Sequence, residues 1–431
     1  MLKEALKRII VENQERMPFP LFKRRAPTLL ATRQIHAVVG LRRAGKTYFL
    51  YQIVNELLAR GVPKQAILLV NFEDERLASL SSAQLGLVLE AYYELFPERV
   101  TGEVHLFFDE IQVVPGWEKF VARLFEEKRY RLRVTGSSSK LLSKEIASSL
   151  RGRSVTTHVH PLSFAEYVEY KGVTLSRNLG YGADRFRVAK LLDDYLTWGG
   201  FFEVVDARDE AERRRIVAAY LDLVVYKDLV ERYGVKNLAL MKALIRYFVT
   251  NTTRKASLAR LHRDFSATMK VARNTVAQYA SFLEDASFLY EVKKFSHSVR
   301  GENTVSKYYV ADPCFKTVAG LNFSADMGVL FENAVCGELL RRGEEPRFFE
   351  WRGECDFVLR RGFRVAEALQ VCIDPIVARE RELRGLLAAM EAFRLDEGTV
   401  VTRDHEAEEV VGRRRIRYVP LWRWLVGERS A

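Results

Sequence analysis

Long apolar runs, internal repeats and paired cysteines are all missing from this chain of 431 residues. No window approaches the roughly 18 uninterrupted apolar residues of a membrane-spanning helix, so no membrane partner is expected. Cysteine is scarce: there are four, all in the last third and none in a C-x-x-C pair. This spacing argues against a structural zinc site or a disulfide framework, and we expect buried free thiols. The four are Cys314, Cys336, Cys355 and Cys372.

Acidic residues are outnumbered by basic ones, 56 to 68, which gives a net charge of +12. Residues 235–300 alone hold twelve Lys/Arg and four Asp/Glu, or +8 of that +12. Such a concentration suits a polyanionic partner. The N-terminal stretch, MLKEALKRIIVENQERM, is amphipathic and charged and lacks the apolar core of a signal peptide, so we expect a cytoplasmic protein.

The first 160 residues contain a regular alternation of apolar strand-like runs and helical patterns. Strands are predicted at residues 35–39, 66–72, 104–108, 130–136 and 154–160. Continuous apolar strands that alternate with helices predict an α/β fold, with a parallel sheet covered on both faces. From Ser163 to about Ala286 the chain reads as helices, and from about Phe288 strands return. This length predicts two to four domains.

A complete phosphate-binding motif, G-x-x-x-x-G-K-[ST], follows the first strand and opens a helix. Its glycines let backbone N–H groups wrap the phosphates, and the helix N-terminus adds its positive dipole end. We expect Lys46 to reach the β- and γ-phosphates and Thr47 to hold Mg²⁺. The predicted nucleotide contacts are Gly40, Arg43, Ala44, Gly45, Lys46, Thr47, Tyr48 and Ser137.

Two acids close the third strand in VHLFFDE. Asp109 would emerge at the carboxyl edge of the sheet, where it could hold Mg²⁺ through water. Glu110 could orient or deprotonate the attacking water, although an Asp-Glu pair at a strand end can also be mere solvated charge. The next strand ends in RVTGSSS, where Ser137, Ser138 or Thr135 could sense the γ-phosphate. A helix N-cap at Ser138 or Ser139 is an equal alternative.

Arg151 and Arg153 flank a glycine in SLRGRS, between a helical pattern and a strand. Either arginine could act on the γ-phosphate bound by a neighbouring subunit, which would make the active form a homo-oligomer. Surface arginines without a catalytic role are the equally weighted alternative.

These residues resemble the AAA-type ATPases, in particular an archaeal and bacterial family that carries a C-terminal domain of unknown function. The resemblance rests on GLRRAGKT, LLVNFEDERL, VHLFFDEIQ, VTGSSS, SLRGRS, PLSFAEY, TWGGFFEVV, VVYKDLVERYG, KYYVADPCF, FENAVCGELL and GECDFVL. It implies Mg²⁺-dependent ATP hydrolysis. The implied domains are an ATPase core at 1–160, a helical lid at 161–235, a winged helix at 236–300 and a nuclease-like α/β domain at 301–431.

Within the basic middle, residues 257–286 predict a helix-turn-helix whose second helix runs from Ala272 to Ala286. The candidate DNA-binding residues are Arg273, Asn274, Gln278, Lys293 and Lys294, the two lysines lying on a wing that meets phosphates. A packing domain with a solvated basic face is the alternative.

The last domain resembles the PD-(D/E)xK nuclease fold, in which acids from a helix and two strands gather a divalent metal beside a lysine. Glu332, Glu354 and Asp356 match the acids. On the next strand, however, Gln370 falls where an acid belongs and Cys372 where the lysine belongs. An amide is a poor Mg²⁺ ligand, so we expect a degenerate domain that binds DNA ends or a protein partner.

The sequence therefore predicts a Mg²⁺-dependent ATPase coupled to DNA binding or remodelling, with ATP and Mg²⁺ as cofactors. Two rivals stay open. One is a slow nucleotide switch that binds a protein partner, and the other is an ATP-driven nuclease.

Overall fold

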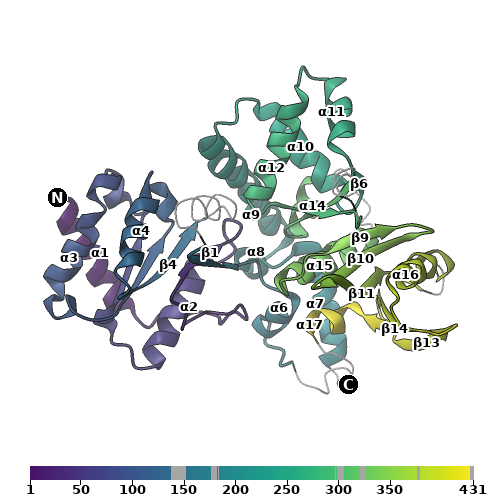
Figure 1. The fold of residues 1–431 in the computed structure, drawn as a ribbon, viewed down its shortest axis with the longest axis horizontal. Coiled ribbons are helices and arrows are strands. Elements are labelled where there is room, and N and C mark those ends of the chain that lie inside the picture. Colours follow the sequence, from purple (N-terminus) through teal and green to yellow (C-terminus); the bar gives the residue numbers. More distant parts are fainter. Residues whose placement is uncertain are drawn as a thin grey trace. The chain divides into compact units, whose positions relative to one another are not determined.

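The computed structural model describes residues 1–136, 152–175, 182, 184–296, 298, 305–320, 327–375 and 379–427. They divide into two compact units, Met1–His160 and Pro161–Ala431, which contain the elements labelled in Figure 1. Within these ranges, no helix is long and apolar enough to cross a membrane. All four cysteines are buried free thiols, as expected.

A five-stranded sheet in the order β2-β3-β4-β1-β5 forms the centre of the first unit. Every neighbouring pair is parallel. The strands are β1 (Ile35–Val39), β2 (Ile67–Asn71), β3 (Val104–Asp109), β4 (Tyr130–Gly136) and β5 (Ser154–His158). This confirms the predicted parallel α/β fold. It also places β4 between β1 and β3, so the carboxyl ends of these three strands share one edge.

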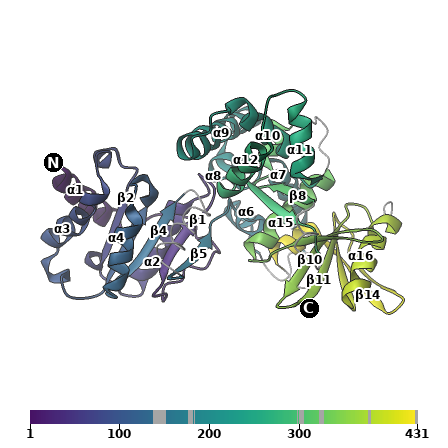
Figure 2. The same cartoon turned by 45° about the horizontal axis from the view of Figure 1, so that its top comes forward.

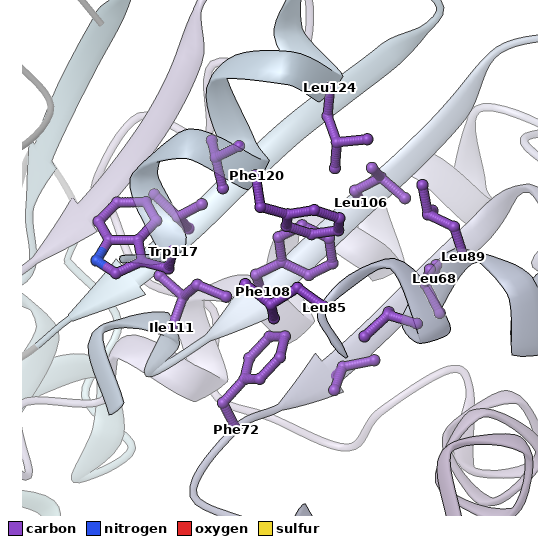
Figure 3. Close-up of a cluster of buried hydrophobic side chains, with 14 of the residues drawn as sticks. Leu68, Phe72, Leu85, Leu89, Leu106, Phe108, Ile111, Trp117, Phe120 and Leu124 are labelled. Carbon is purple, nitrogen blue, oxygen red and sulfur yellow. The ribbon is translucent and has the colours of Figure 1, made fainter. Parts of the chain in front are cut away.

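Helices cover the sheet on both faces. Successive side chains of a strand point to opposite faces, and the strand residues on both faces are buried. On one face, α2 (Lys46–Ala59) packs against β3 and β4. The opposite face is covered by α1 (Leu2–Arg16), α3 (Gly86–Leu95) and α4 (Trp117–Glu126). Figure 3 shows Phe120 and Leu124 of α4 packed over Leu106 and Phe108 of β3.

The second unit begins with a helical region, as predicted. Its helices are α6 (Phe164–Tyr170), α7 (Asp184–Trp198), α8 (Phe202–Asp206), α9 (Glu210–Leu223) and a π-helical segment (Val224–Glu231).

Two glycines at the α7–α8 junction approach a later part of the chain. A Cβ on Gly199 would lie 1.6 Å from Asp312 Oδ1, and the Gly200 N–H donates to Asp312 Oδ2 at 2.9 Å. The WGG and VADP stretches therefore meet through a buried carboxylate.

The basic middle and the strand that comes after it follow the order helix, short strand, helix, helix and two further strands. These elements are α10 (Leu238–Thr250), β6 (Lys255–Ala256), α11 (Leu258–Ser266), α12 (Arg273–Asp285), β7 (Leu289–Lys293) and β8 (Ser306–Val310). The strands form a sheet in the order β6-β8-β7. The predicted second helix of the helix-turn-helix is confirmed as α12.

A mixed six-stranded sheet, ordered β13-β14-β12-β11-β10-β9, completes the second unit (Figure 2). Helix α16 packs over β10 and β11 and covers one face of this sheet. The remaining elements are α14 (Cys314–Ala319), α15 (Met327–Arg341), β9 (Arg347–Glu350), β10 (Glu354–Arg361), β11 (Arg364–Val371), α16 (Arg379–Phe393), β12 (Glu397–Thr402), β13 (Ala407–Val411), β14 (Arg414–Pro420) and α17 (Leu421–Val426).

Candidate active site

The loop between β1 and α2 has a backbone that only a few residues can adopt. Gly40 has φ +150°, and a Cβ there would lie 2.0 Å from the Val159 carbonyl oxygen. Arg43 and Gly45 also have positive φ, at 68° and 97°. Alternation of left-handed and right-handed residues turns successive backbone N–H groups toward one concavity, which favours anions.

A buried arginine that the sequence reasoning missed braces this loop. The Arg24 guanidinium donates to the Ala44 carbonyl at 3.1 Å and to the His160 carbonyl at 2.8 Å. Its backbone N–H donates to Gln52 Oε1 at 2.7 Å. Arg24 thereby ties the phosphate-binding loop to α2 and to the chain that follows β5. No motif spacing marks it, because its partners are backbone carbonyls.

Three side chains meet where β3, β4 and α2 converge. Thr47 Oγ1 donates to Asp109 Oδ2 at 2.7 Å, and Thr135 Oγ1 donates to Asp109 Oδ1 at 2.5 Å. The Thr135 hydroxyl also accepts the Glu110 backbone N–H at 2.8 Å. Burial raises the pKa of Asp109 to about 6, and the adjacent Glu110 carboxylate adds to the rise. Thr135, which the sequence offered as an alternative to the serines, thus orients the Asp109 carboxylate and holds the backbone of Glu110.

The predicted catalytic lysine and glutamate face each other across this edge. Lys46 Nζ lies 3.4 Å from Glu110 Oε1, and both side chains are buried. Burial alone would raise the pKa of Glu110, but Lys46 and a hydrogen bond from Gln112 outweigh it, so the pKa is lowered. Glu110 has φ 51°, a left-handed conformation that costs on the order of 1–3 kcal/mol in a non-glycine residue.

These residues fit a magnesium-bound nucleotide. Thr47 and Asp109 put a hydroxyl and a carboxylate oxygen within 2.7 Å of each other, and oxygen donors are what Mg²⁺ prefers. The buried Lys46 ammonium lies next to the anion-binding loop. Thr47 and Asp109 would hold the ion, which when bound would neutralise charge on the phosphates.

Three other predicted residues of this site, Arg43, Tyr48 and Arg153, are less enclosed. Arg43 and Tyr48 are exposed, and Tyr48 packs edge-on against Tyr51 with ring centroids 5.5 Å apart. Arg153 pairs with Glu126 and lies over the ring of Phe125. The remaining candidates lie outside the described residues: Ser137, Ser138, Ser139 and Arg151.

The candidate DNA-binding residues fall into two groups. Arg273, Asn274 and Gln278 are exposed on α12, whose opposite side buries Val276 and Tyr279. The two lysines, in contrast, have acidic neighbours. Lys293 Nζ lies 4.0 Å from Glu291, and Lys294 Nζ lies 3.2 Å from Glu350.

A buried lysine lies among the three acids that the sequence predicted as metal ligands in the C-terminal part of the chain. Lys307 Nζ of β8 lies 2.6 Å from Glu354, 2.9 Å from Glu332 and 3.1 Å from Asp356. Burial opposes its charge, but the three carboxylates together hold the pKa of Lys307 well above its ordinary value. The ammonium therefore supplies the positive charge that a metal ion would bring to these acids. The sequence reasoning missed Lys307, because it lies outside the E-x-K pattern.

The neighbouring glutamine is part of the same network. Gln370 Oε1 accepts the Asp356 backbone N–H at 3.2 Å, and Gln370 Nε2 donates to Glu382 at 2.6 Å. Cys372 packs in the apolar core beneath α16. Within the described ranges, no three His, Cys, Asp or Glu side chains are grouped so as to hold a metal ion.

Comparison with known proteins agrees with the motifs. Residues 32–168 match the AAA domain family, and residues 189–325 match a domain of unknown function, DUF8612. An uncharacterised protein of Methanocaldococcus jannaschii is 33% identical over 410 residues, which cover 92% of this chain and 89% of the relative. One of Haemophilus influenzae is 31% identical over 316 residues, which cover 72% of this chain and 75% of the relative.

Among solved structures, a Walker-type ATPase of Pyrococcus abyssi covers 74% of this chain and 95% of its own, with 17% identity and a TM-score of 0.44. This chain belongs to the archaeal and bacterial family of AAA-type P-loop proteins in which a domain of unknown function follows the AAA domain. Its first unit is accordingly a nucleotide-binding domain of the AAA type.

Proposed function

We propose that the protein is a Mg²⁺-dependent ATPase whose nucleotide cycle is coupled to DNA binding. The observation that carries this proposal is the convergence of Thr47, Asp109 and Thr135 beside the Lys46–Glu110 pair. A metal-holding pair, a phosphate-binding lysine and a base are what phosphoryl transfer to water requires. All of them lie at the carboxyl edge of a parallel sheet, where open α/β folds bind ligands.

In this proposal Lys46 exchanges partners during the cycle. When ATP binds, the ammonium turns to the β- and γ-phosphates, and the Glu110 carboxylate is released to accept a proton from water. The strained backbone at Glu110 supports this role, because left-handed non-glycine residues persist where the surroundings hold them for function. Thr135 keeps the Asp109 carboxylate oriented and Gln112 keeps the Glu110 carboxylate oriented while the lysine moves.

An arginine from a second copy completes the site, and Arg153 or Arg151 supplies it. Arg153 is partly exposed and held by Glu126, an exposed pair of the kind that contributes on the order of 1 kcal/mol or less. Breaking the Arg153–Glu126 pair, so that Arg153 can reach the γ-phosphate bound by a neighbouring subunit, therefore costs little free energy. This makes the active form a homo-oligomer.

DNA binding is assigned to the basic middle, which we interpret as a winged helix. The order of helices and strands from α10 to β8 supports it, and so does the exposed polar side of α12. The amino-terminal residues of a recognition helix contact bases in the major groove, and Arg273, Asn274 and Gln278 have that position. Lys293 and Lys294 would leave their acidic partners for phosphates.

The test is phosphate release from ATP by the full chain, with variants at both members of the Lys46–Glu110 pair. Lys46→Ala should lose nucleotide binding, and Glu110→Gln should keep binding but lose hydrolysis. Hydrolysis by Lys46→Ala at the wild-type rate would remove the catalytic assignment. Duplex binding that weakens with salt and is lost in Arg273→Ala would support the DNA assignment. No duplex binding at low salt would favour a switch that binds a protein partner.

For the C-terminal part, we propose binding rather than cutting. The Lys307 ammonium among Glu332, Glu354 and Asp356 favours this, because it competes with a divalent metal for the same carboxylates. The experiment is incubation with duplexes, forks and junctions in Mg²⁺ or Mn²⁺. Cleavage that disappears in Asp356→Ala would instead establish the ATP-driven nuclease.

A further inference from the structure

The tip of the β10–β11 hairpin and the carboxyl end of α16 border a groove of about 810 Å³ in the second unit. Figure 2 shows β10, β11 and α16 side by side. We call it the arginine groove, and the lining residues that matter here are Phe295, Arg360, Phe363, Arg364, Phe393 and Arg394. Its volume is in the range of sites for small organic ligands, roughly 300–1,000 Å³.

The charge of the arginine groove is all of one sign. Three arginines line it, and the described residues that line it include no carboxylate. Arg360, Arg364 and Arg394 are exposed and have no ion-pair partner within the described part of the chain. Elsewhere in this unit, guanidinium groups are commonly paired: Arg361 with Glu344 and Glu367, and Arg417 with Glu397. Three unpaired guanidiniums around one hollow therefore favour an anionic ligand.

Aromatic rings are the second feature of the arginine groove. The Phe363 residue is 100% exposed at the hairpin tip, although an apolar ring in water is unfavourable. Phe295 and Phe393 pack together with ring centroids 4.7 Å apart. An exposed ring beside unpaired arginines presents a stacking face and phosphate donors together.

A third feature is the backbone at Arg394. This residue follows α16 with φ 57°, the left-handed position at a helix end where glycine is usual. An L-residue is strained there, because its Cβ crowds the following carbonyl oxygen. Glycine would fit this position without strain. The presence of an arginine is therefore consistent with a binding role for its side chain.

We propose that the arginine groove binds single-stranded nucleic acid. A base of an unpaired strand stacks on Phe363, and the arginines contact the flanking phosphates. A duplex does not offer this contact, because the faces of its bases are stacked on one another. An acidic peptide would satisfy the arginines but would leave the Phe363 ring without a flat partner. The proposal concerns a surface remote in sequence from α12 and does not depend on ATP hydrolysis.

The experiment is fluorescence anisotropy with the full chain, without nucleotide, and a labelled oligothymidylate of about 20 nucleotides. Two variants remove the proposed contacts without disturbing packing. Phe363→Ala removes an exposed ring, and Arg394→Gly removes a charge while relaxing the backbone. The matched control is Arg361→Gln, on the same hairpin but paired with Glu344 and Glu367. A duplex of equal length and a polyglutamate competitor complete the set.

The expected result is a loss of about ten-fold in oligothymidylate affinity for Phe363→Ala, from one lost stack. Arg394→Gly should also weaken binding and make its salt dependence shallower, whereas Arg361→Gln should bind as the wild type does. Duplex binding by Phe363→Ala should be unchanged. The proposal is overturned if Phe363→Ala binds the oligothymidylate normally, or if Arg361→Gln is weakened as much as Arg394→Gly. Equal competition by polyglutamate would also overturn it and would assign the groove to an acidic protein.

Discussion

At the scale of single residues, Gly40 is the position in the phosphate-binding loop with the least freedom. Gly40→Ala should lower the free energy of unfolding by about 1–3 kcal/mol and abolish nucleotide binding, because its Cβ would overlap the Val159 carbonyl. Gly102→Ala is the matched control: φ is +141°, but nothing lies within 4 Å of the added carbon. Calorimetry and nucleotide titration measure both effects. Equal behaviour of the two variants would contradict the steric argument.

Thr135 is the residue whose hydroxyl holds Asp109 and the backbone of Glu110 at once. Thr135→Val keeps the shape but removes both hydrogen bonds, so the rate of ATP hydrolysis should fall by roughly 10–100-fold. Nucleotide affinity should change much less, since Thr135 does not belong to the loop. Thr157→Val, which loses a hydrogen bond to His36 at 2.8 Å, serves as the control. A large loss of affinity in Thr135→Val would refute the orienting role.

The sequence could predict that Lys46, Thr47, Asp109 and Glu110 lie close together, because the motif fixes their spacing and the strand fixes its direction. Their roles toward a nucleotide stay predictions. Thr135 could be named only as one alternative among hydroxyl residues, since which of them reaches Asp109 depends on the register of β3 and β4. Lys307 could not be predicted. In SKYYVAD it reads as a lone charge in a strand, and its three partners come from α15 and β10.

At the scale of elements, β1 and β3 each carry a buried histidine on either side of β4. Burial, with the Arg133 charge adding to it, lowers the pKa of His36 and of His105 to about 4. A depressed pKa means that the folded state resists protonation. Each histidine therefore makes its full contribution to the free energy of unfolding above about pH 6.5. That contribution falls by roughly 3 kcal/mol as the pH falls toward 4.

The first unit should thus lose stability steeply between pH 6.5 and 4. His36→Gln should make the dependence of stability on pH shallower. The variant lacks one of the two side chains that bind a proton only when the chain unfolds. Calorimetric melting of the full chain across this pH range measures the slope. A wild-type slope in His36→Gln and in His105→Gln would contradict the assignment.

The junction of β8, α15 and β10 depends on the Lys307 ammonium. Lys307→Met leaves buried carboxylates without a counter-charge and should cost about 3–5 kcal/mol. Lys255→Met is the matched control, since Lys255 also contacts Glu354, at 2.7 Å, but is about one-third exposed. The control should cost about 1 kcal/mol or less. Urea denaturation followed by tryptophan fluorescence reports mainly on this unit, which holds four of the five tryptophans. Equal losses would refute the internal counter-ion.

Element positions were well predicted where the pattern was continuous. The limits of β1 and β4 are those expected from the sequence, because fully buried parallel strands are unbroken apolar runs. The π-helical segment at Val224–Glu231 could not be expected, since its apolar spacing resembles that of an ordinary helix.

At the scale of the whole molecule, the fold class and the family followed from motifs spread over most of the chain. The sequence could not reveal the arginine groove, because it assembles hairpin residues 360–364 with residues near 295 and 394. Surfaces of this kind depend on tertiary packing, whereas a phosphate-binding loop is contiguous in sequence.

The proposed function depends on coupling between DNA and ATP hydrolysis at the Lys46–Glu110 site. The most direct measurement is phosphate release from ATP and Mg²⁺ at one low salt concentration, with and without duplex DNA, by the wild type, Lys46→Ala and Glu110→Gln. We expect DNA to stimulate hydrolysis strongly, and we expect both variants to lose hydrolysis by about a hundred-fold or more. A rate that is indifferent to DNA, or that survives in Lys46→Ala, would contradict it.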